Sequence, residues 1–202
     1  MNVVRACVVG GVARCIGIST DKACRAVTAY GASKLAMEKL FQAQLTAPTT
    51  FTLVRYGNVV ASNGSVIPTW QQQAEQGQPI TLTDRRCTRF WMAPSEAVSL
   101  IVRAADEIPS TIIVPKMGAL SLEETAQYAI GTRYLTTVET GLRSCEKIHE
   151  DLVSVDEPAV ELNQHFRLWS AERPGVCYTS DTAPRLTRDA FLAMLEEAES
   201  YE

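Results

Sequence analysis

The chain has 202 residues, of which 46% are hydrophobic and 21% are charged, a composition typical of a folded globular protein. Its formal net charge of -4 argues against the basic surface that nucleic-acid-binding proteins carry. No apolar run approaches the ~20 residues that a membrane helix needs, and the N-terminus lacks the features of a signal peptide.

The first part of the chain alternates between expected helices and short apolar strands. The expected elements are a helix over 2–9 closed by two glycines, a strand over 14–18, a helix over 30–45, a strand over 51–56 and a loop over 57–65.

The later part continues the alternation less regularly. We expect a helix over 67–76, a strand over 79–83, a helix over 95–107, a strand over 111–114, a helix over 122–130, a strand over 134–138, irregular structure over 154–184 and an acidic amphipathic helix over 187–201. Short buried strands alternating with helices predict an α/β fold with a parallel sheet, in which ligands bind at the carboxyl ends of the strands.

The six cysteines form no C-x-x-C pair, and no His or Cys cluster has the spacing of metal ligands. Several lie in apolar runs, such as Cys7 in CVVGGV and Cys15 in RCIGIS. We therefore expect buried, reduced thiols, a cytoplasmic protein and no metal site.

Tyr30 and Lys34 form Y-x-x-x-K at the start of the helix expected over 30–45. Residues four apart share one helix face, and an ammonium beside a phenol favours the phenolate, so this tyrosine could act as a base. The alternative is a surface lysine one turn from a half-buried tyrosine.

Asp21 and Lys22 lie in a polar cluster at the end of the first expected strand, nine residues before Tyr30. A carboxylate and an ammonium side by side could divide acid and base roles. The alternative is a solvated salt pair.

Six segments, in one order, resemble one family. They are STDKA…YGASKLAMEKLF, VRYGNVVASNGSVIPTW, GQPITLTDRRCTRFWM, EAVSLI, VPKMGALS and GLRSCEKIHEDL. From Asn2 to about Leu152 the chain resembles the UDP-N-acetylglucosamine 4,6-dehydratase group of polysaccharide-biosynthesis proteins, within the extended short-chain dehydrogenases/reductases. The resemblance implies a partial doubly wound, Rossmann-type parallel-sheet domain with a smaller C-terminal substrate-binding region.

The resemblance also implies a division of labour along the chain. Residues 1–65 would be the C-terminal part of a dinucleotide-binding domain, and 66–202 mainly a UDP-sugar-binding region, with segments near 88–107 returning to the first domain. A homo-oligomer is expected for the complete protein, with no nucleic acid or membrane partner.

The resemblance assigns roles to particular residues. The implied catalytic residues are Thr20, Asp21, Lys22 and Tyr30, and the implied contacts of the cofactor NADP are Tyr30, Lys34 and Tyr56. Tyr30 would take the proton from the sugar 4-hydroxyl, and Thr20 would hydrogen-bond the 4-oxygen. Lys22 would remove the proton on carbon 5, and Asp21 would help the 6-hydroxyl leave as water, although the division between these two is open.

The substrate side follows from the same comparison. Asn58 would contact the diphosphate, Thr83 would lie near the nucleoside, and Arg89 would pair with phosphate, which suits a guanidinium. Arg143 and Glu146 would bind phosphate and ribose hydroxyls. For any one arginine, the alternative is an ordinary surface charge.

Two features bear on the subtype. Asp-Lys together with a tyrosine resembles the members that also invert carbon 5. An epimerase acting on a UDP-sugar is the alternative reaction on this scaffold, but it needs no acid–base pair at carbons 5 and 6.

The chain departs from the family pattern in three places. The usual Arg-Pro-Gly-Glu-Lys is here Arg143–Lys147 with Ser144 and Cys145 in the middle, and the usual Asn-Pro is Arg25-Ala26. No G-x-x-G-x-x-G motif for the cofactor phosphates occurs in the 202 residues. We therefore expect that the first mononucleotide-binding half is missing and that this chain is inactive alone, and an inactive remnant is the non-enzymatic alternative.

Overall fold

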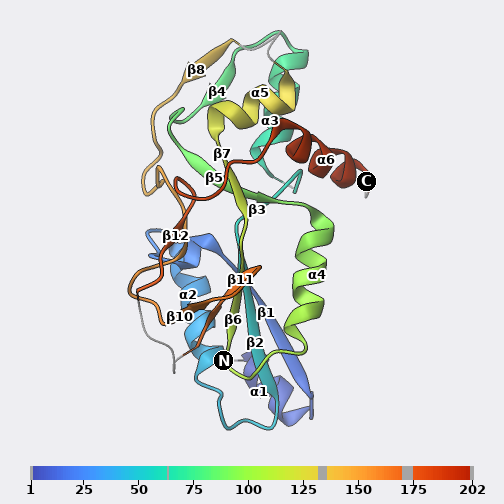
Figure 1. Cartoon of the computed structure of the whole chain (residues 1–202), viewed down its shortest axis with the longest axis vertical. Coiled ribbons are helices and arrows are strands. Elements are labelled where there is room, and N and C mark those ends of the chain that lie inside the picture. Colours follow the sequence, from blue (N-terminus) through green and yellow to red (C-terminus); the bar gives the residue numbers. More distant parts are fainter. Residues whose placement is uncertain (1, 63, 132–135, 170–174, 201–202) are drawn as a thin grey trace. The chain divides into compact units, whose positions relative to one another are not determined.

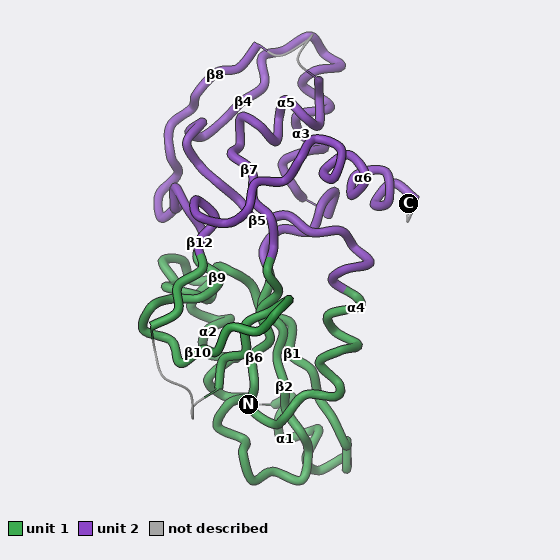
Figure 2. Tube along the Cα trace, in the orientation of Figure 1, with its two compact units in different colours: residues 1–56, 98–116, 151–178 green, residues 57–97, 117–150, 179–202 purple. Residues whose placement is uncertain are grey.

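The computed structural model describes residues 2–62, 64–131, 136–169 and 175–200. Contacts within the chain divide it into two compact units (Figure 2). Unit 1 comprises Met1–Tyr56, Val98–Lys116 and Asp151–Tyr178, and unit 2 comprises Gly57–Ala97, Met117–Glu150 and Thr179–Glu202. The functional division expected at residue 65 stays a prediction.

Unit 1 is built on a five-stranded sheet in the order β1-β2-β6-β11-β10. The strands are β1 (Arg14–Thr20), β2 (Thr50–Tyr56), β6 (Ile112–Pro115), β11 (His165–Leu168) and β10 (Ala159–Glu161). The pairs β1–β2 and β2–β6 are parallel, whereas β11 and β10 join antiparallel. The predicted α/β fold with a parallel sheet is confirmed.

Helices cover this sheet in the pattern that parallel strands require, because each crossover places a helix on a face. The helices are α1 (Asn2–Val9), α2 (Ala29–Gln42) and α4 (Pro94–Ala104), whose last seven residues belong to unit 1. Figure 1 shows α2 and α4 on opposite sides of the strands. Helix α2 ends three residues before the predicted position 45, since the chain turns ahead of Pro48 to enter β2.

The core of unit 1 lies between the sheet and these helices. Phe41 of α2 meets Phe51 of β2 edge to face, with ring centroids 5.1 Å apart. On the other face, Leu100 and Ala104 of α4 pack against Val54. The strand β2 is buried from Phe51 to Arg55, which is why its sequence, FTLVR, does not alternate between apolar and polar residues.

Unit 2 contains a three-stranded sheet, a two-stranded sheet and helices. Its strands are β3 (Asn58–Val59), β5 (Thr88–Met92) and β7 (Gly118–Ser121) in one sheet, and β4 (Ile80–Leu82) and β8 (Thr137–Glu139) in the other. Its helices are α3 (Val66–Glu75), α5 (Leu122–Ile130) and α6 (Arg188–Glu199). The strands β5 and β7 were not predicted, because a fully buried five-residue strand shows no alternation and a four-residue strand is too short to stand out.

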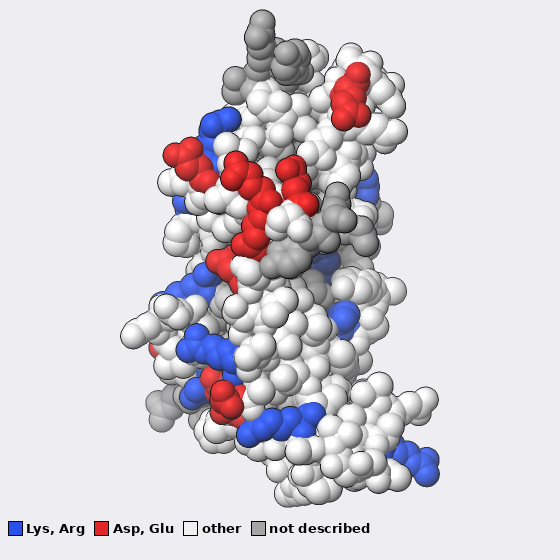
Figure 3. Space-filling view, turned by 90° about the vertical axis from the view of Figure 1, so that its right-hand side faces the viewer, with Lys and Arg blue, Asp and Glu red and all other residues white. Residues whose placement is uncertain are grey.

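Aromatic side chains and helix caps stabilise unit 2. Trp91 of β5 meets Phe191 of α6 with ring centroids 5.7 Å apart. A capping box joins Ser121 and Glu124 at the start of α5. Helix α6 is acidic. Figure 3 looks at the side of unit 2 on which α6 lies and shows acidic side chains gathered there.

The region over 154–184 is more regular than predicted. It contains β10, β11 and β12 (Tyr178–Thr179), and β12 pairs with β9 (Asp151–Val153) just before it. These strands are two to four residues long, so their sequences carry no period of their own. Part of the strand expected over 134–138 and the end of the helix expected to 201 lie outside the described residues.

The expectation of buried thiols holds for two cysteines only. Cys24 and Cys87 are buried, whereas Cys7 and Cys15 are partly exposed and Cys145 and Cys177 are exposed. No helix among the described residues is both long and apolar enough to cross a membrane.

Candidate active site

The turn that follows β1 carries the first group of candidate residues. Thr20 ends the strand and caps the short 3-10 helix η1 (Asp21–Ala23), its side chain accepting from the Lys22 backbone N–H at 3.4 Å. The segment therefore leaves the carboxyl end of a parallel strand as a tight turn, the position where ligands bind in such sheets.

Asp21 is fully buried beside a lysine. Its Oδ1 accepts hydrogen bonds from Thr20 Oγ1 at 2.9 Å and from Lys22 Nζ at 3.0 Å. Its Oδ2 has no hydrogen-bond partner among the described residues. A buried carboxylate oxygen without a donor is costly, but Oδ2 is closed to solvent in this structure, so a ligand hydroxyl reaches it only when the turn moves. The alternative to a catalytic role was a salt pair in solvent. The aspartate of this pair is buried, so that alternative does not describe it.

The start of α2 approaches this turn closely, and Gly31 is the reason. Thr28 caps the helix by accepting from the Gly31 N–H at 3.0 Å. A Cβ on Gly31 would lie 2.1 Å from the backbone oxygen of Lys22, which is inside any permitted contact. The glycine in Y-G-A-S-K therefore lets the helix bearing Tyr30 pack on the turn bearing Lys22.

Tyr30 and Lys34 share one face of α2, as their spacing predicts. Lys34 Nζ lies 5.9 Å from the centre of the Tyr30 ring and donates to the Ile18 carbonyl of β1 at 2.9 Å. Tyr30 is 53% exposed. Tyr56, at the end of β2, is half-buried, and burial, followed by the nearby Tyr30, raises the pKa of its phenol. Unit 1 thus brings together all six residues predicted to be catalytic or cofactor-binding.

These residues fit one end of a dinucleotide. The Lys34 ammonium uses one donor on Ile18, which leaves donors for ribose hydroxyls, and the exposed Tyr30 hydroxyl is free to meet a substrate oxygen. No glycine-rich phosphate loop occurs in the sequence, so the fit is limited to the nicotinamide-ribose end.

In unit 2, Glu146 makes hydrogen bonds with three of the other four predicted substrate-binding residues. Its Oε1 accepts from Thr83 Oγ1 at 2.9 Å and from Arg89 Nη2 at 3.0 Å, and its Oε2 accepts from the Arg143 backbone N–H at 3.1 Å. Arg89 is buried and also donates to the carbonyls of Thr88 and Ile148. Two side chains expected to bind different parts of a nucleotide therefore bind each other.

The remaining predicted substrate residue, Asn58, lies on β3 opposite Trp91, two positions along β5 from Arg89. The loop before Glu146 keeps a left-handed backbone at Cys145, with φ 64°, where the family pattern has glycine. Arg25, at the family's asparagine, is left-handed too, with φ 48°. The chain keeps both turns without the residues that favour them.

A buried ionic network beneath the η1 turn was missed in the sequence. Arg55 is fully buried and pairs with Glu38 of α2 and Glu157, while Ser19 donates to Glu38 at 2.6 Å. The available signal was an arginine inside the apolar strand FTLVRY, since a buried charge requires partners.

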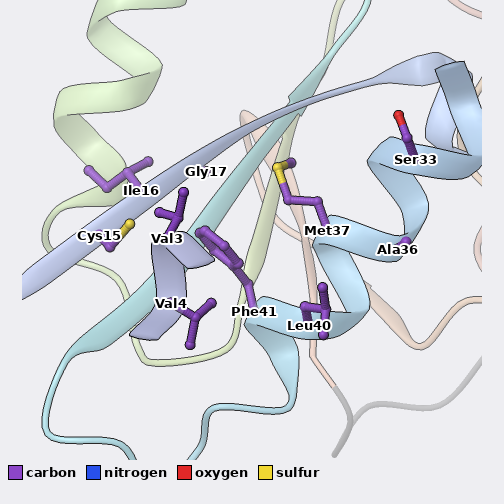
Figure 4. A pocket seen from close by; sticks show the side chains of 10 residues that line it. All are labelled: Val3, Val4, Cys15, Ile16, Gly17, Ser33, Ala36, Met37, Leu40 and Phe41. Carbon is purple, nitrogen blue, oxygen red and sulfur yellow. The ribbon is translucent and has the colours of Figure 1, made fainter. Parts of the chain in front are cut away.

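Unit 1 also contains a cavity of about 370 Å³, and none of the predicted catalytic or cofactor-binding residues lines it. Figure 4 shows its lining, which comes from α1, β1 and α2. The lining residues are Val3, Val4, Cys15, Ile16, Gly17, Ser33, Ala36, Met37, Leu40 and Phe41. An apolar lining with one hydroxyl and one thiol offers nothing to a phosphate, so the candidate site is the strand-end cluster and not this cavity.

The fold and the site together define a class. A parallel sheet whose first described strand ends at Thr20 and leads through an Asp-Lys turn to a helix opening with Tyr-x-x-x-Lys is a Rossmann-type short-chain dehydrogenase/reductase arrangement. Residues 1–170 match the family model described as "Polysaccharide biosynthesis protein". The chain belongs to this polysaccharide-biosynthesis family.

Curated relatives refine the family. The chain is 36% identical over 181 residues to a UDP-N-acetylglucosamine 4,6-dehydratase (inverting) of Campylobacter jejuni, covering 87% of this chain and 53% of that protein. It is also 36% identical over 181 residues to a UDP-glucose 4-epimerase of Rickettsia bellii, covering 83% and 52%. The chain thus spans about half the length of these relatives, which are nucleotide-sugar dehydratases and epimerases.

A solved structure matches most of the chain. Pen from Bacillus thuringiensis superposes with a TM-score of 0.86 at 30% identity, over 96% of this chain and 65% of that one. A UDP-glucose 4-epimerase from Thermotoga maritima superposes with a TM-score of 0.64 at 12% identity, which supports the fold alone.

Proposed function

We propose that this chain carries the catalytic turn and the nucleotide-sugar-binding region of an NADP-dependent 4,6-dehydratase that acts on UDP-N-acetylglucosamine and inverts carbon 5. The observation that carries the proposal is the buried Asp21 paired with Lys22 at the strand end, on which the Tyr30 helix packs through Gly31. The name of the Campylobacter relative supports the substrate.

The chemistry at carbon 4 falls to α2. Tyr30 takes the proton of the 4-hydroxyl, and Thr20 turns its hydroxyl hydrogen from Asp21 Oδ1 to the 4-oxygen. Lys34 stabilises the phenolate and holds ribose hydroxyls, with Tyr56 as a further contact. NADP, when bound, supplies the hydride acceptor at carbon 4 and the hydride donor at carbon 6.

The chemistry at carbons 5 and 6 falls to the η1 turn. A 4-keto group acidifies the proton on carbon 5, which Lys22 removes. Passage of the shared proton from Lys22 Nζ to Asp21 leaves a neutral amine, which takes the proton of carbon 5, and a carboxylic acid, which gives its proton to the departing 6-hydroxyl so that it leaves as water. Because Lys22 and Asp21 are adjacent, one short turn can serve both steps.

In this proposal, residues of unit 2 bind the uridine diphosphate. Arg89 and Arg143 meet phosphate, Asn58 meets the diphosphate, and Thr83 and Glu146 meet the nucleoside. Binding requires Glu146 to exchange Arg89 for ribose hydroxyls, after which the guanidinium is free for phosphate. We place the complete enzyme in the cytoplasm, as a homo-oligomer.

A 4-epimerase is the second candidate, because the Rickettsia bellii relative named as a UDP-glucose 4-epimerase has the same 36% identity as the Campylobacter dehydratase, over a slightly smaller share of this chain. The two reactions share oxidation at carbon 4. They differ at carbon 5, where only dehydration breaks a C–H bond.

The test mixes the 202-residue chain with the N-terminal portion of the Campylobacter dehydratase that precedes the matched region, adds NADP and UDP-N-acetylglucosamine in heavy water, and follows the sugar by NMR. The proposal expects a 4-keto-6-deoxy sugar, inverted and deuterated at carbon 5. A UDP-N-acetylgalactosamine product without deuterium at carbon 5 would establish the epimerase instead.

A further inference from the structure

A buried arginine lies under the candidate catalytic turn, and its contacts reach both ends of that turn. Arg55 of β2 is fully buried. Its guanidinium donates hydrogen bonds to Glu38 from Nε at 2.9 Å and from Nη2 at 2.7 Å. It also donates to Glu157 from Nη1 at 2.8 Å and from Nη2 at 2.6 Å. Nη1 also donates to the Leu152 carbonyl at 2.9 Å. All five guanidinium N–H donors can be used in this way.

Each carboxylate holds one flank of the catalytic turn. Glu38 Oε1 accepts from Ser19 Oγ at 2.6 Å, one residue before Thr20. Glu157 Oε2 accepts from Cys24 Sγ at 3.3 Å, one residue after Ala23. The four residues between these two attachments include Asp21 and Lys22. The turn is therefore fixed at both ends by groups that Arg55 holds in place.

The contacts of Glu157 and Arg55 favour the ionised form of each. Burial would raise the pKa of Glu157, but its hydrogen bonds and ion pair with Arg55 outweigh burial and lower it. Burial would lower the pKa of Arg55, and the two glutamates outweigh that effect as well. The pKa of the Cys24 thiol is raised, chiefly by burial, so it remains a thiol that can donate to Glu157.

A purely structural role does not account for this arrangement. Well-packed apolar side chains usually replace a buried ion pair with little loss of stability, so stability alone gives no need for a three-member network. What the network adds is direction, because a bidentate guanidinium fixes two carboxylates and each carboxylate fixes one backbone position.

We propose that Arg55 is a positioning residue, which through Glu38–Ser19 and Glu157–Cys24 holds the Thr20–Ala23 turn in the geometry that presents Asp21 and Lys22. The importance of that geometry rests on the proposed function, whereas the holding itself does not. It can be measured without substrate, so the two proposals can fail separately.

The test measures local opening in the 202-residue protein. Glu157→Gln keeps the shape of the side chain but removes the charge that Arg55 grips. We expect amide exchange over residues 20–24 to rise at least about tenfold, while amides of β2 stay protected. Alkylation of Cys24 should also become faster, in part because loss of the Glu157 charge lowers the pKa of this thiol. Glu157→Asp, which keeps the charge, should give an intermediate rate.

Two controls separate local from global effects. Cys87 is a buried thiol of unit 2, and its alkylation should not change. Glu161→Gln removes an exposed ion pair with Lys116 in unit 1, at 2.7 Å in the native protein, and should leave Cys24 slow.

Three outcomes would overturn the proposal. They are unchanged amide exchange over residues 20–24 in Glu157→Gln, a rise in exchange over β2 together with residues 20–24, and an equal rise in Glu161→Gln. If Glu157→Gln does not fold, Ser19→Ala removes only the first attachment. It should raise exchange at Thr20 and Asp21 by at least about threefold, and unchanged exchange there would reject the inference.

Discussion

At the scale of single residues, Cys145 holds a backbone conformation that its side chain opposes. Its φ of 64° lies in the left-handed region, which costs an L residue roughly 1–2 kcal/mol relative to glycine. The turn places Glu146, whose carboxylate joins Thr83 and Arg89. The geometry survives without glycine because the contacts of Glu146 fix the loop that follows.

Replacing Cys145 by glycine should therefore stabilise the protein. We expect Cys145→Gly to raise the free energy of unfolding by about 1 kcal/mol in urea denaturation. Cys145→Ala is the matched control, since it removes the thiol but keeps the Cβ, and it should have little effect. Equal stabilisation by both variants would attribute the gain to loss of the thiol and not to backbone relief.

A second residue-scale prediction concerns the division between Lys22 and its neighbours. In the mixture with the N-terminal portion of the Campylobacter relative, Lys22→Ala should leave oxidation at carbon 4 in place and slow deuterium exchange at carbon 5 by about 100-fold or more, the usual contribution of a positioned base. Tyr30→Phe should instead abolish both steps. Normal exchange in Lys22→Ala would mean that another group removes the proton.

At the scale of elements, the approach of α2 to the η1 turn depends on Gly31. A Cβ there would lie 2.1 Å from the Lys22 carbonyl oxygen, and that atom is backbone, so the helix or the turn must move. We expect Gly31→Ala to lower the free energy of unfolding by about 1–3 kcal/mol, the usual cost of overpacking, despite the better helix propensity of alanine.

The measurement is urea denaturation, with Ser33→Ala as the control, because Ser33 is an exposed residue at the cavity rim of the same helix and its hydroxyl bonds only the Tyr30 carbonyl one turn back. That variant should change stability by less than about 0.5 kcal/mol. A more stable Gly31→Ala protein would show that α2 and the turn are not in contact in solution.

The ionic network under the turn adds a pH dependence at the same scale. The pKa of Glu157 is lowered in the folded protein from its ordinary 4.5. A lowered folded pKa gives stability that is present above the unfolded pKa and is lost as pH falls through the folded one.

The stability difference between the native protein and Glu157→Gln should therefore shrink between about pH 6 and about pH 3. Urea denaturation across that range measures it. Glu161→Gln, whose native pair is exposed, should show a difference close to zero throughout. If the stability difference for Glu157→Gln does not change with pH, the ionised carboxylate of Glu157 is not its cause.

At the scale of the whole molecule, the two units divide the candidate residues cleanly. Those assigned to catalysis and cofactor lie in unit 1, and those assigned to the nucleotide sugar lie in unit 2. Lys34 and Tyr30 can hold the nicotinamide ribose, but the 202 residues contain no glycine-rich loop for the cofactor phosphates.

We therefore expect the 202-residue chain alone to bind NADP too weakly for use, because each lost charge-assisted phosphate contact costs about 1.5–3 kcal/mol. Calorimetric titration, alone and with the N-terminal portion of the Campylobacter relative, measures this. Affinity should appear only in the mixture. Micromolar binding by the chain alone would mean that other residues in it hold the phosphates.

The sequence alone determined the segment that runs from β1 through the η1 turn to α2. An apolar run, a polar cluster at its end and an i, i+4 pair on the next helix are local signals, and each depends on residues a few positions apart. The helix expected over 122–130 was likewise found at the predicted residues, as α5. The sequence did not predict the short strands β5, β7 and β9 to β12, because they are too short or too uniformly buried to show a period.

Which charged side chains pair with one another depends on tertiary packing. Arg55 pairs with Glu157 across 102 positions, and Arg89 pairs with Glu146 across 57. A buried ion must find a partner, but the sequence does not say which distant segment will bring one. The partners follow from the sheet order and from the turns that return the chain to it, which are properties of packing and not of any local pattern.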